Sequence, residues 1–248
     1  MRPFLAALSL LSCIPLGSFQ PTEQEMRRSI HFFPVVGIVF GALFFAIAHF
    51  FSTHLPLSAG AVAAMLCAVL PEALTKGFHL DGLADTADGF LSGRTRERKL
   101  EIMRDSRTGT MGVFAIFALL GMKYALFDSM DAVLAPAAAL MMLNGRCSMV
   151  LYIGMSSYAR KEGLGALFFQ SKPWFGMVFA YCAMLVCGWF LAGMRGIVCG
   201  AMIAVFSWVW SRVTFRVIGG ATGDTIGANE ELSELLTLFL LFLDVADF

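Results

Sequence analysis

Long apolar windows separated by shorter polar connections run along most of the chain. Each window holds roughly 17 to 25 residues, the length that a helix needs to cross about 30 Å of hydrocarbon. They lie at Phe32–Phe51, Ser58–Leu74, Gly109–Phe127, Ala132–Gly154, Trp174–Gly193 and Ile197–Phe215. The pattern predicts an all-α, polytopic membrane protein with about six to seven transmembrane helices.

The two ends of the chain leave alternatives open. Leu232–Phe248 is shorter and carries Glu234, Asp244 and Asp247, so it either spans, lies in the interface or packs on the other helices. Pro3–Gly17 is too short to cross and has a proline near each end, which favours a re-entrant or interfacial segment. A signal peptide is the competing interpretation, but one positive charge precedes the apolar run and the usual small-residue cleavage pattern is missing.

Composition agrees with a membrane protein, because 58% of the residues are hydrophobic, 15% are charged and the mean hydropathy is +0.75. The formal net charge is zero, so no basic excess argues for nucleic acid as a partner. The six cysteines form no Cys-x-x-Cys pair and lie mostly in apolar runs, which indicates small buried residues and neither a disulfide framework nor a metal site. We expect one membrane domain over residues 1–248, surrounded by membrane lipid.

Positively charged residues gather in alternate connections. If the spans alternate across the membrane, the opposite side holds Asp128, Asp131 and the single Arg195. Because cytoplasmic loops are enriched in Lys and Arg, the N-terminus and the motifs described next are expected on the cytoplasmic side. The residues that fall on that side are Arg27, Arg28, Lys76, Arg94, Arg96, Arg98, Lys99, Arg104, Arg107, Arg160, Lys161, Lys172, Arg212 and Arg216.

The connection after the second window opens with three acidic side chains. On a helix, Asp81, Asp85 and Asp88 lie at i, i+4 and i+7 and share one face. Carboxylates held this close repel one another unless water or a cation screens them, and Mg²⁺ prefers oxygen ligands of this kind. A solvated acidic face is the alternative, but the position between two apolar stretches favours a metal site.

The same connection continues through a run of arginines to Arg104-Asp105-Ser106-Arg107-Thr108-Gly109. Carboxylates that bind Mg²⁺, followed by guanidinium groups that grip phosphate oxygens, are suited to transfer from a pyrophosphate. An ordinary positive-inside loop explains the arginines equally well, although it does not explain Asp105.

A glycine-rich island, Gly219–Asn229, follows the sixth window. Its backbone can approach a ligand closely and offer N–H groups to anionic oxygens, and Asp224 can add a metal ligand. A plain turn is the alternative. Arg160 lies in a connection on the same predicted face, and His79 beside Asp81 is a candidate for supporting the site.

Arg146 lies inside the fourth window. A charge inside a span is costly unless it faces a partner or water, so we expect it to point toward an anion in the protein interior. Snorkelling of its head group to the interface is the alternative.

Four motifs, taken in order, resemble the adenosylcobinamide-GDP ribazoletransferase family, the cobalamin synthases of corrinoid assembly. They are Thr75-x-Gly77-x-His79-x-Asp81-Gly82-x-x-Asp85-x-x-Asp88, Asp105-Ser106-Arg107-x-Gly109, Arg160-x-x-Gly163-Leu164-Gly165 and Gly219-Gly220-x-Thr222-Gly223-Asp224-x-x-Gly227-Ala228. No single motif is decisive, but four in this order with this membrane layout are specific.

The resemblance implies a Mg²⁺-dependent enzyme of the bacterial cytoplasmic (inner) membrane, with its active face in the cytoplasm. It implies that adenosylcobinamide-GDP and α-ribazole, or α-ribazole 5′-phosphate, are joined and that GMP is released. The preferred ribazole substrate, the number of Mg²⁺ ions and the existence of a homo-oligomer stay open. Carried over by motif, the catalytic and metal-binding residues are Asp81, Asp85, Asp88 and Asp105, with Asp224 as a further metal ligand. The residues implied to hold substrate or phosphate are His79, Arg107, Arg146, Arg160, Gly220, Thr222 and Gly223.

Two other readings remain. Asp85-x-x-Asp88-Gly89 followed by Asp105 partly resembles the CDP-alcohol phosphotransferases, but Gly109 stands where that family expects a further Asp. A transporter is the alternative from another class, yet transporters usually place substrate ligands near the midplane, whereas these acidic residues gather at one face.

Overall fold

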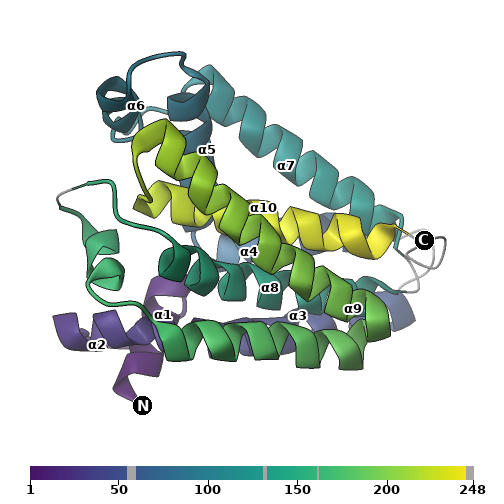
Figure 1. The fold of residues 1–248 in the computed structure, drawn as a ribbon. Helices are drawn as coiled ribbons and strands as arrows, with labels where there is room; N and C mark the ends of the chain where they lie inside the picture. Colours follow the sequence, from purple (N-terminus) through teal and green to yellow (C-terminus); the bar gives the residue numbers. More distant parts are fainter. Residues whose placement is uncertain (55–59, 131–132, 161, 244–248) are drawn as a thin grey trace.

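Helices make up nearly all the regular structure in the computed structural model, which describes residues 1–54, 60–130, 133–160 and 162–243 (Figure 1). Among these residues, β-type pairing is limited to an isolated parallel bridge between Tyr158 and Ala221. The prediction of an all-α protein is confirmed. The elements in chain order are α1 (Arg2–Leu11), α2 (Glu23–Ser29), η1 (Ile30–Phe32), α3 (Phe33–His54), α4 (Gly60–Leu74), α5 (Phe78–Leu91), α6 (Arg96–Ile102), α7 (Thr110–Asp128), α8 (Leu134–Met155), η4 (Leu164–Phe169), α9 (Trp174–Ile218) and α10 (Gly223–Phe242).

Several helices are long and apolar enough to cross a membrane. Among the described residues these are Glu23–His54, which joins α2, η1 and α3, together with α7, α8 and α9, and the bent pair of α4 and α5 adds one more if it counts as a single span. The chain is therefore a multi-pass membrane protein.

Helix α9 contains two of the predicted windows. Its backbone is non-helical at Gly193, where the chain turns back on itself (Figure 1). Across this turn Met184 faces Gly200, and a Cβ added at Gly188 would lie 2.5 Å from the carbonyl oxygen of Gly196. The two halves of α9 therefore pack as a helical hairpin whose closest approach needs glycine on both sides.

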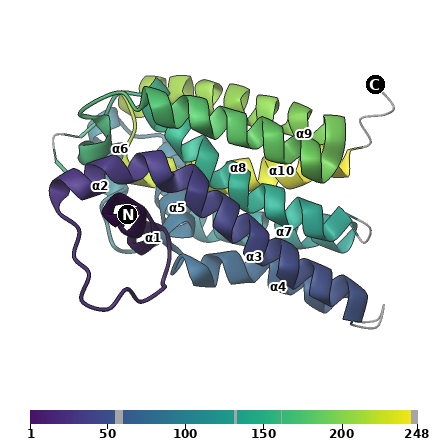
Figure 2. The ribbon, with the colours of Figure 1, turned by 90° about the horizontal axis from the view of Figure 1, so that it is seen from below.

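Helix α8 lies at the centre of the bundle, and nearly all of its residues are buried (Figure 2). It packs against α3, α9 and α10. A Cβ added at Gly41 of α3 would lie 2.8 Å from the Ala139 carbonyl oxygen, and one at Gly37 would lie 3.1 Å from the Cβ of Arg146. Close packing of small residues is a main attraction between helices in lipid, where the hydrophobic effect no longer draws them together.

The last helix lies inside the bundle. α10 is buried along most of its length and packs against α8, α5 and α9. Of the alternatives for the last apolar stretch, packing on the other helices is therefore the one observed, and the helix begins at Gly223, well before Leu232. Asp244 and Asp247 lie outside the described residues.

The N-terminal helix α1 is too short to span, as its sequence indicated. It has 10 residues, and its buried side chains are Ala6, Ala7 and Leu11. These pack it against α2 and α3.

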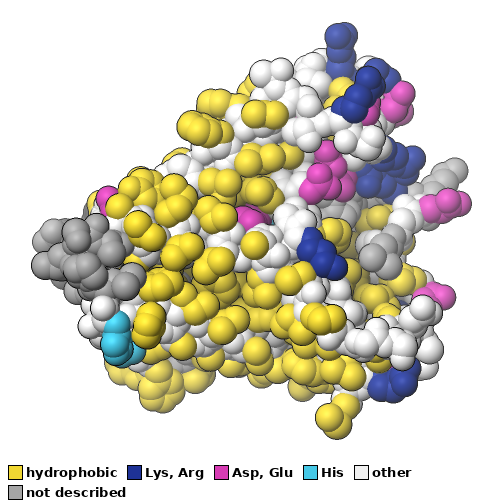
Figure 3. Space-filling model, turned by 180° about the vertical axis from the view of Figure 1, so that it is seen from behind, with side chains coloured by type: hydrophobic (Ala, Val, Ile, Leu, Met, Phe, Trp, Pro, Cys, Tyr) yellow, Lys and Arg dark blue, Asp and Glu magenta, His cyan; other side chains and the backbone are white. Residues whose placement is uncertain are grey.

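The molecular surface separates apolar sides from one charged end. Figure 3 shows hydrophobic side chains along the body, while most Lys, Arg, Asp and Glu side chains gather at one end. Phe117, Phe175 and Phe190 are 79%, 74% and 80% exposed, values that suit a surface facing lipid. The charged end is formed by α5, α6 and the first turns of α7 and α10 (Figure 1).

Candidate active site

A sharp backbone break turns α5 across the charged end of the bundle. Lys76 and Gly77 both have positive φ, 57° and 68°, and the chain bends by 90° between α4 and α5. Glycine adopts this conformation freely, whereas a residue such as lysine does so at a cost of roughly 1–2 kcal/mol. The Gly77 amide donates to the Glu72 carbonyl oxygen at 2.8 Å and closes α4. The aspartates of α5 are thereby placed at the polar end, outside the spans.

The three aspartates of α5 differ in exposure. Asp81 is exposed, while Asp85 and Asp88 are half-buried. Burial, reinforced by the carboxylates of Asp81, Asp224 and Asp88, raises the pKa of Asp85 to about 7, and Arg160 opposes this rise. The cluster therefore holds more negative charge than its neighbours compensate.

Asp224 reaches the same cluster from α10. Thr222 caps this helix, since its hydroxyl accepts from the Thr225 amide at 3.2 Å. Asp224 follows in the first turn, where the positive end of the helix dipole favours a carboxylate. A Cβ added at Gly82 would lie 2.7 Å from the Asp224 carbonyl oxygen, so glycine at this position lets α5 and α10 approach. Arg160 donates to the Asp224 carboxylate at 2.6 Å.

The glycine-rich island joins α10 to the segment that carries Arg160. The Ala221 amide donates to the Ser157 carbonyl oxygen at 2.7 Å, and the Ala159 amide donates to the Ala221 carbonyl oxygen at 2.8 Å. A Cβ added at Gly220 would collide with the Ser157 carbonyl group, whereas one at Gly223 would meet nothing within 4 Å. Gly220 therefore serves this pairing, and Gly223 leaves open space beside Asp224.

Asp88 ties α5 to the start of α7. Its carboxylate accepts hydrogen bonds from the amides of Gly109 at 2.6 Å and Gly112 at 2.9 Å. A Cβ added at either glycine would lie 2.5 Å from an oxygen of Asp88, so only glycine admits the carboxylate here. Asp88 thus satisfies amides that the first turn of α7 leaves without helical partners.

Asp105 does not join the aspartate cluster in this structure, contrary to the expectation that it would help to close the site. Its carboxylate accepts from the Arg107 side chain at 3.0 and 2.8 Å and from the Arg107 amide at 3.1 Å. These hydrogen bonds lower the pKa of Asp105 to about 2. Because Arg107 follows Asp105 by only two residues, its side chain and amide can both donate to the Asp105 carboxylate. Both side chains line a hollow that also reaches Asp88.

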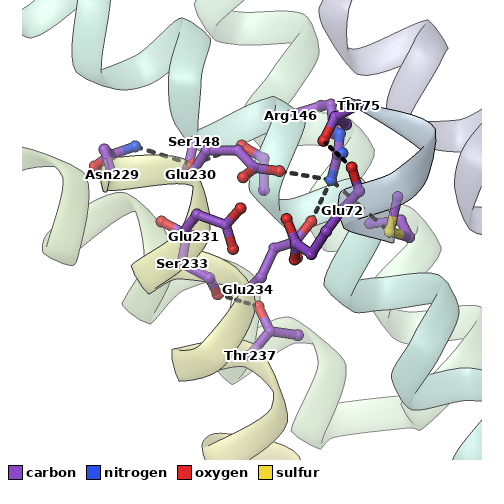
Figure 4. A network of polar contacts seen from close by, with 12 residues as sticks. Glu72, Thr75, Arg146, Ser148, Asn229, Glu230, Glu231, Ser233, Glu234 and Thr237 are labelled. Carbon is purple, nitrogen blue, oxygen red and sulfur yellow. Dashed lines mark hydrogen bonds and ion pairs between the residues drawn. The ribbon is translucent and has the colours of Figure 1, made fainter. Parts of the chain in front are cut away.

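Arg146 faces anions inside the protein, as expected of a charge within a span, but these anions are glutamates of α10. The side chain is 1% exposed, pairs with Glu230 at 2.6 Å and also pairs with Glu234 (Figure 4). Its charge is balanced by these carboxylates, which follow Asp224 by about two to three turns of α10. A phosphate-binding role for Arg146 has no support in this geometry.

Sequence reasoning missed the other members of this buried cluster. Lys123 of α7 lies among three carboxylates, at 3.0 Å from Glu72, 2.7 Å from Glu231 and 2.7 Å from Glu234. Oxygens of the three glutamates lie within 4.8 Å of one another, but the lysine ammonium already provides the cation among them. Lys123 itself could have indicated this cluster, because an ionisable residue inside an apolar window is expected to have a buried partner of opposite charge.

Hollows open at different points along α5. One of about 590 Å³ borders Asp81, and one of about 580 Å³ borders Asp88 and Arg107. A cavity of about 230 Å³ borders His79 and Asp224. The start and the end of α5 therefore border separate spaces that could hold different parts of a donor and an acceptor.

The donor set suits a hard divalent cation. Asp81, Asp85 and Asp224 provide carboxylate oxygens from two helices, and Asp88 lies on the same face of α5. Mg²⁺ prefers such ligands and usually keeps several waters beside one or two carboxylates. The raised pKa of Asp85 marks negative charge that a cation would neutralise.

Comparison with known proteins gives a consistent result. The chain matches the family described as "Cobalamin-5-phosphate synthase" over residues 3–242. It is 34% identical over 242 residues to a protein of Geotalea daltonii named "Adenosylcobinamide-GDP ribazoletransferase", and the alignment covers 97% of each chain. Proteins of the same name match from Klebsiella pneumoniae subsp. pneumoniae, 37% identical with 97% and 99% coverage, and from Listeria monocytogenes, 32% identical with 98% coverage of both chains. No solved structure matches.

Proposed function

Because the chain belongs to the cobalamin-5-phosphate synthase family, we propose that it is an adenosylcobinamide-GDP ribazoletransferase that joins adenosylcobinamide-GDP to α-ribazole or its 5′-phosphate and releases GMP. The observation that carries this proposal is the full-length match to proteins of that name. The same match favours this reaction over a CDP-alcohol phosphotransferase or a transporter.

The reaction exchanges one phosphorus–oxygen bond for another. A ribazole hydroxyl attacks the phosphorus next to the aminopropanol arm of the cobinamide, and a new phosphodiester bond forms. The bond between that phosphorus and the oxygen that bridges it to the second phosphorus breaks, and GMP leaves with the bridging oxygen and the electron pair of that bond. The hydroxyl proton passes to one of the carboxylates around α5. In a transfer of this kind the main tasks of the protein are to position the reacting groups and to compensate the charge on the phosphates.

The residues around α5 divide these tasks. Arg160 already holds Asp224 through one guanidinium nitrogen, while its Nε has no partner, so it can also reach a phosphate oxygen. Arg107 lines the hollow beside Asp88, and its side chain is 86% exposed. It is free to exchange Asp105 for a phosphate of the donor.

Mg²⁺ fits the carboxylates of Asp81, Asp85 and Asp224 and, when bound there, would neutralise charge on the phosphate oxygens and on the departing GMP. Asp88 supports this set by holding the start of α7 against α5. The arrangement also agrees with an active face in the cytoplasm, since the charged end carries the Arg- and Lys-rich connections.

The test uses the full chain purified in detergent, supplied with adenosylcobinamide-GDP, α-ribazole and Mg²⁺. Chromatography should detect GMP and the joined corrinoid in equal amounts, and mass spectrometry should confirm the new phosphodiester. EDTA should stop the reaction and added Mg²⁺ should restore it. GMP release without a joined product would overturn the transferase assignment, and turnover insensitive to EDTA would overturn the metal requirement alone.

A further inference from the structure

A cavity of about 230 Å³ lies between the start of α5, the last two turns of α8, the segment around Arg160 and the first turns of α10. Most of its wall is apolar, with Phe33, Met149, Ile153 and Phe168 among the lining residues. Its polar side is formed by His79, Arg160 and Asp224. The cavity therefore joins an apolar interior to the edge of the aspartate cluster.

His79 is the unexplained group of this cavity. The residue is 1% exposed, and neither ring nitrogen has a hydrogen-bond partner among the residues that the structure describes. A buried polar group left without a partner is destabilising, because it has lost its hydrogen bonds to water and gained none in return. A neutral imidazole offers one N–H donor and one nitrogen acceptor. A ligand that supplies a complementary polar atom inside an apolar space would remove this cost.

Aromatic rings and glycines shape the cavity beside His79. Tyr158 contributes a ring that lies 5.1 Å from the ring of Phe169. A Cβ added at Gly163 would lie 2.8 Å from the Tyr158 hydroxyl, and one at Gly165 would lie 3.1 Å from its ring. Phe169 therefore lies against the tyrosine ring, and the two glycines let the chain pass close beside it without a side chain that would enter the cavity.

We propose that this cavity binds the aromatic base of the nucleoside substrate, with His79 hydrogen-bonded to a ring nitrogen of the base. The inference rests on the proposed function, because it assigns the nucleoside substrate to the start of α5. Pockets for drug-sized ligands measure about 300–1,000 Å³, so a cavity of this size suits a bicyclic base and excludes a corrinoid. A lipid tail would leave both nitrogens of His79 unpaired, which favours a heteroaromatic occupant.

The position of the cavity accounts for the orientation of the sugar. Asp224 lines the cavity and also belongs to the carboxylate cluster around Asp85. With its base buried beside His79, a nucleoside therefore has its ribose hydroxyls next to the groups that take up the proton. The hollow beside Asp88 and Arg107, nearer the end of α5, is left for the phosphates of the donor.

The test compares KM values for the two substrates in the full chain. His79→Leu removes both polar atoms at similar volume, and we expect KM for α-ribazole to rise about tenfold, as the loss of one good hydrogen bond implies. KM for adenosylcobinamide-GDP should stay unchanged. His79→Gln, which keeps a donor and an acceptor, should recover part of the loss. His49→Leu, an exposed histidine of α3, is the matched control and should leave both KM values unchanged.

A second pair of variants tests the cavity by filling it. Ile153→Trp inserts a larger side chain into the cavity, and Val186→Trp makes the same insertion on the exposed face of α9. The first should raise KM for α-ribazole and the second should not. Free 5,6-dimethylbenzimidazole, a benzimidazole base without its sugar, should inhibit the wild-type enzyme competitively against α-ribazole. It should not compete with adenosylcobinamide-GDP.

The outcomes separate the cavity from the reaction. Normal turnover with unchanged KM values in His79→Leu, together with non-competitive inhibition by the free base, would overturn the cavity assignment and leave the function standing. If the wild-type protein shows no turnover but binds α-ribazole, and His79→Leu weakens that binding, the function fails and the cavity assignment stands. A lipid tail retained in the cavity, displaced by neither nucleoside nor base, would overturn it.

Discussion

At the scale of single residues, the site depends on which carboxylates remain available to a ligand. Within the described parts of the chain, Asp85 has no hydrogen-bonded cation, and it is crowded by Asp81 and Asp224. Asp88 is held by two backbone amides, and Asp105 is held by Arg107. The three aspartates of α5 and Asp105 thus differ in how far their carboxylates are already bound by the protein, a difference that the sequence pattern does not show.

Replacing two of these aspartates should separate their roles. Asp85→Asn removes a carboxylate at the centre of the cluster, and the loss of a metal contact worth several kcal/mol should lower kcat by at least about 100-fold. Asp105→Asn breaks an exposed pair with Arg107, and such pairs contribute about 0–1 kcal/mol, so the loss should stay below about tenfold. GMP release at saturating substrates measures both. Equal losses would show that Asp105 acts within the same cluster.

At the scale of elements, the apolar helices could be predicted from the sequence, because the length of an apolar window matches the number of residues that a helix needs to cross the bilayer. α3, α4, α7, α8 and the two halves of α9 begin and end near the predicted limits. The break at Lys76 and Gly77 was not predicted, because a left-handed lysine leaves no mark in the hydropathy pattern. It is this break that turns α5 out of the membrane direction and gives the aspartates their place.

The hairpin in α9 gives a prediction at the same scale. Gly188→Val places side-chain atoms where the backbone of Gly196 lies, so we expect the protein to lose at least about 1–3 kcal/mol of stability through overpacking. Gly121→Val is the matched control, because a Cβ at this exposed glycine of α7 meets nothing within 4 Å. Thermal unfolding of both variants in detergent, followed by circular dichroism, measures the difference. Similar unfolding temperatures would contradict the close approach of the two halves.

At the scale of the whole molecule, the sequence shows which groups need partners but not which partners they find. A charge in the fourth window predicted that Arg146 faces an anion, and this proved correct. The anions are glutamates of α10, and they reach Arg146 because α10 lies inside the bundle. This position was hard to predict, because acidic residues are unusual in a buried helix. Likewise, Asp224 could be assigned to the site from its motif, but its contact with Arg160 and its approach to Gly82 required the structure.

The buried charges link four helices to the active end. One network joins four carboxylates to two cations, with Glu72 from α4, Lys123 from α7, Arg146 from α8 and three glutamates from α10. Figure 4 shows Arg146 with the carboxylates around it. α10 carries Asp224 in its first turn and these glutamates about two turns later. The network therefore fixes the depth of α10 and, through it, the position of Asp224.

Removing the shared cation should show this coupling. Lys123→Met leaves Glu72, Glu231 and Glu234 facing one another in the interior, and breaking a buried pair in this way costs about 3–5 kcal/mol. We expect a lower unfolding temperature in detergent and, in the fraction that stays folded, slower GMP release because Asp224 shifts. Lys123→Met combined with Glu231→Gln should recover part of the stability, since one uncompensated charge disappears. Lys99→Met, on α6 at the polar end, is the control and should unfold like the wild type. An unchanged unfolding temperature for Lys123→Met would mean that packing of α8 and α10, without their charges, sets the depth of α10.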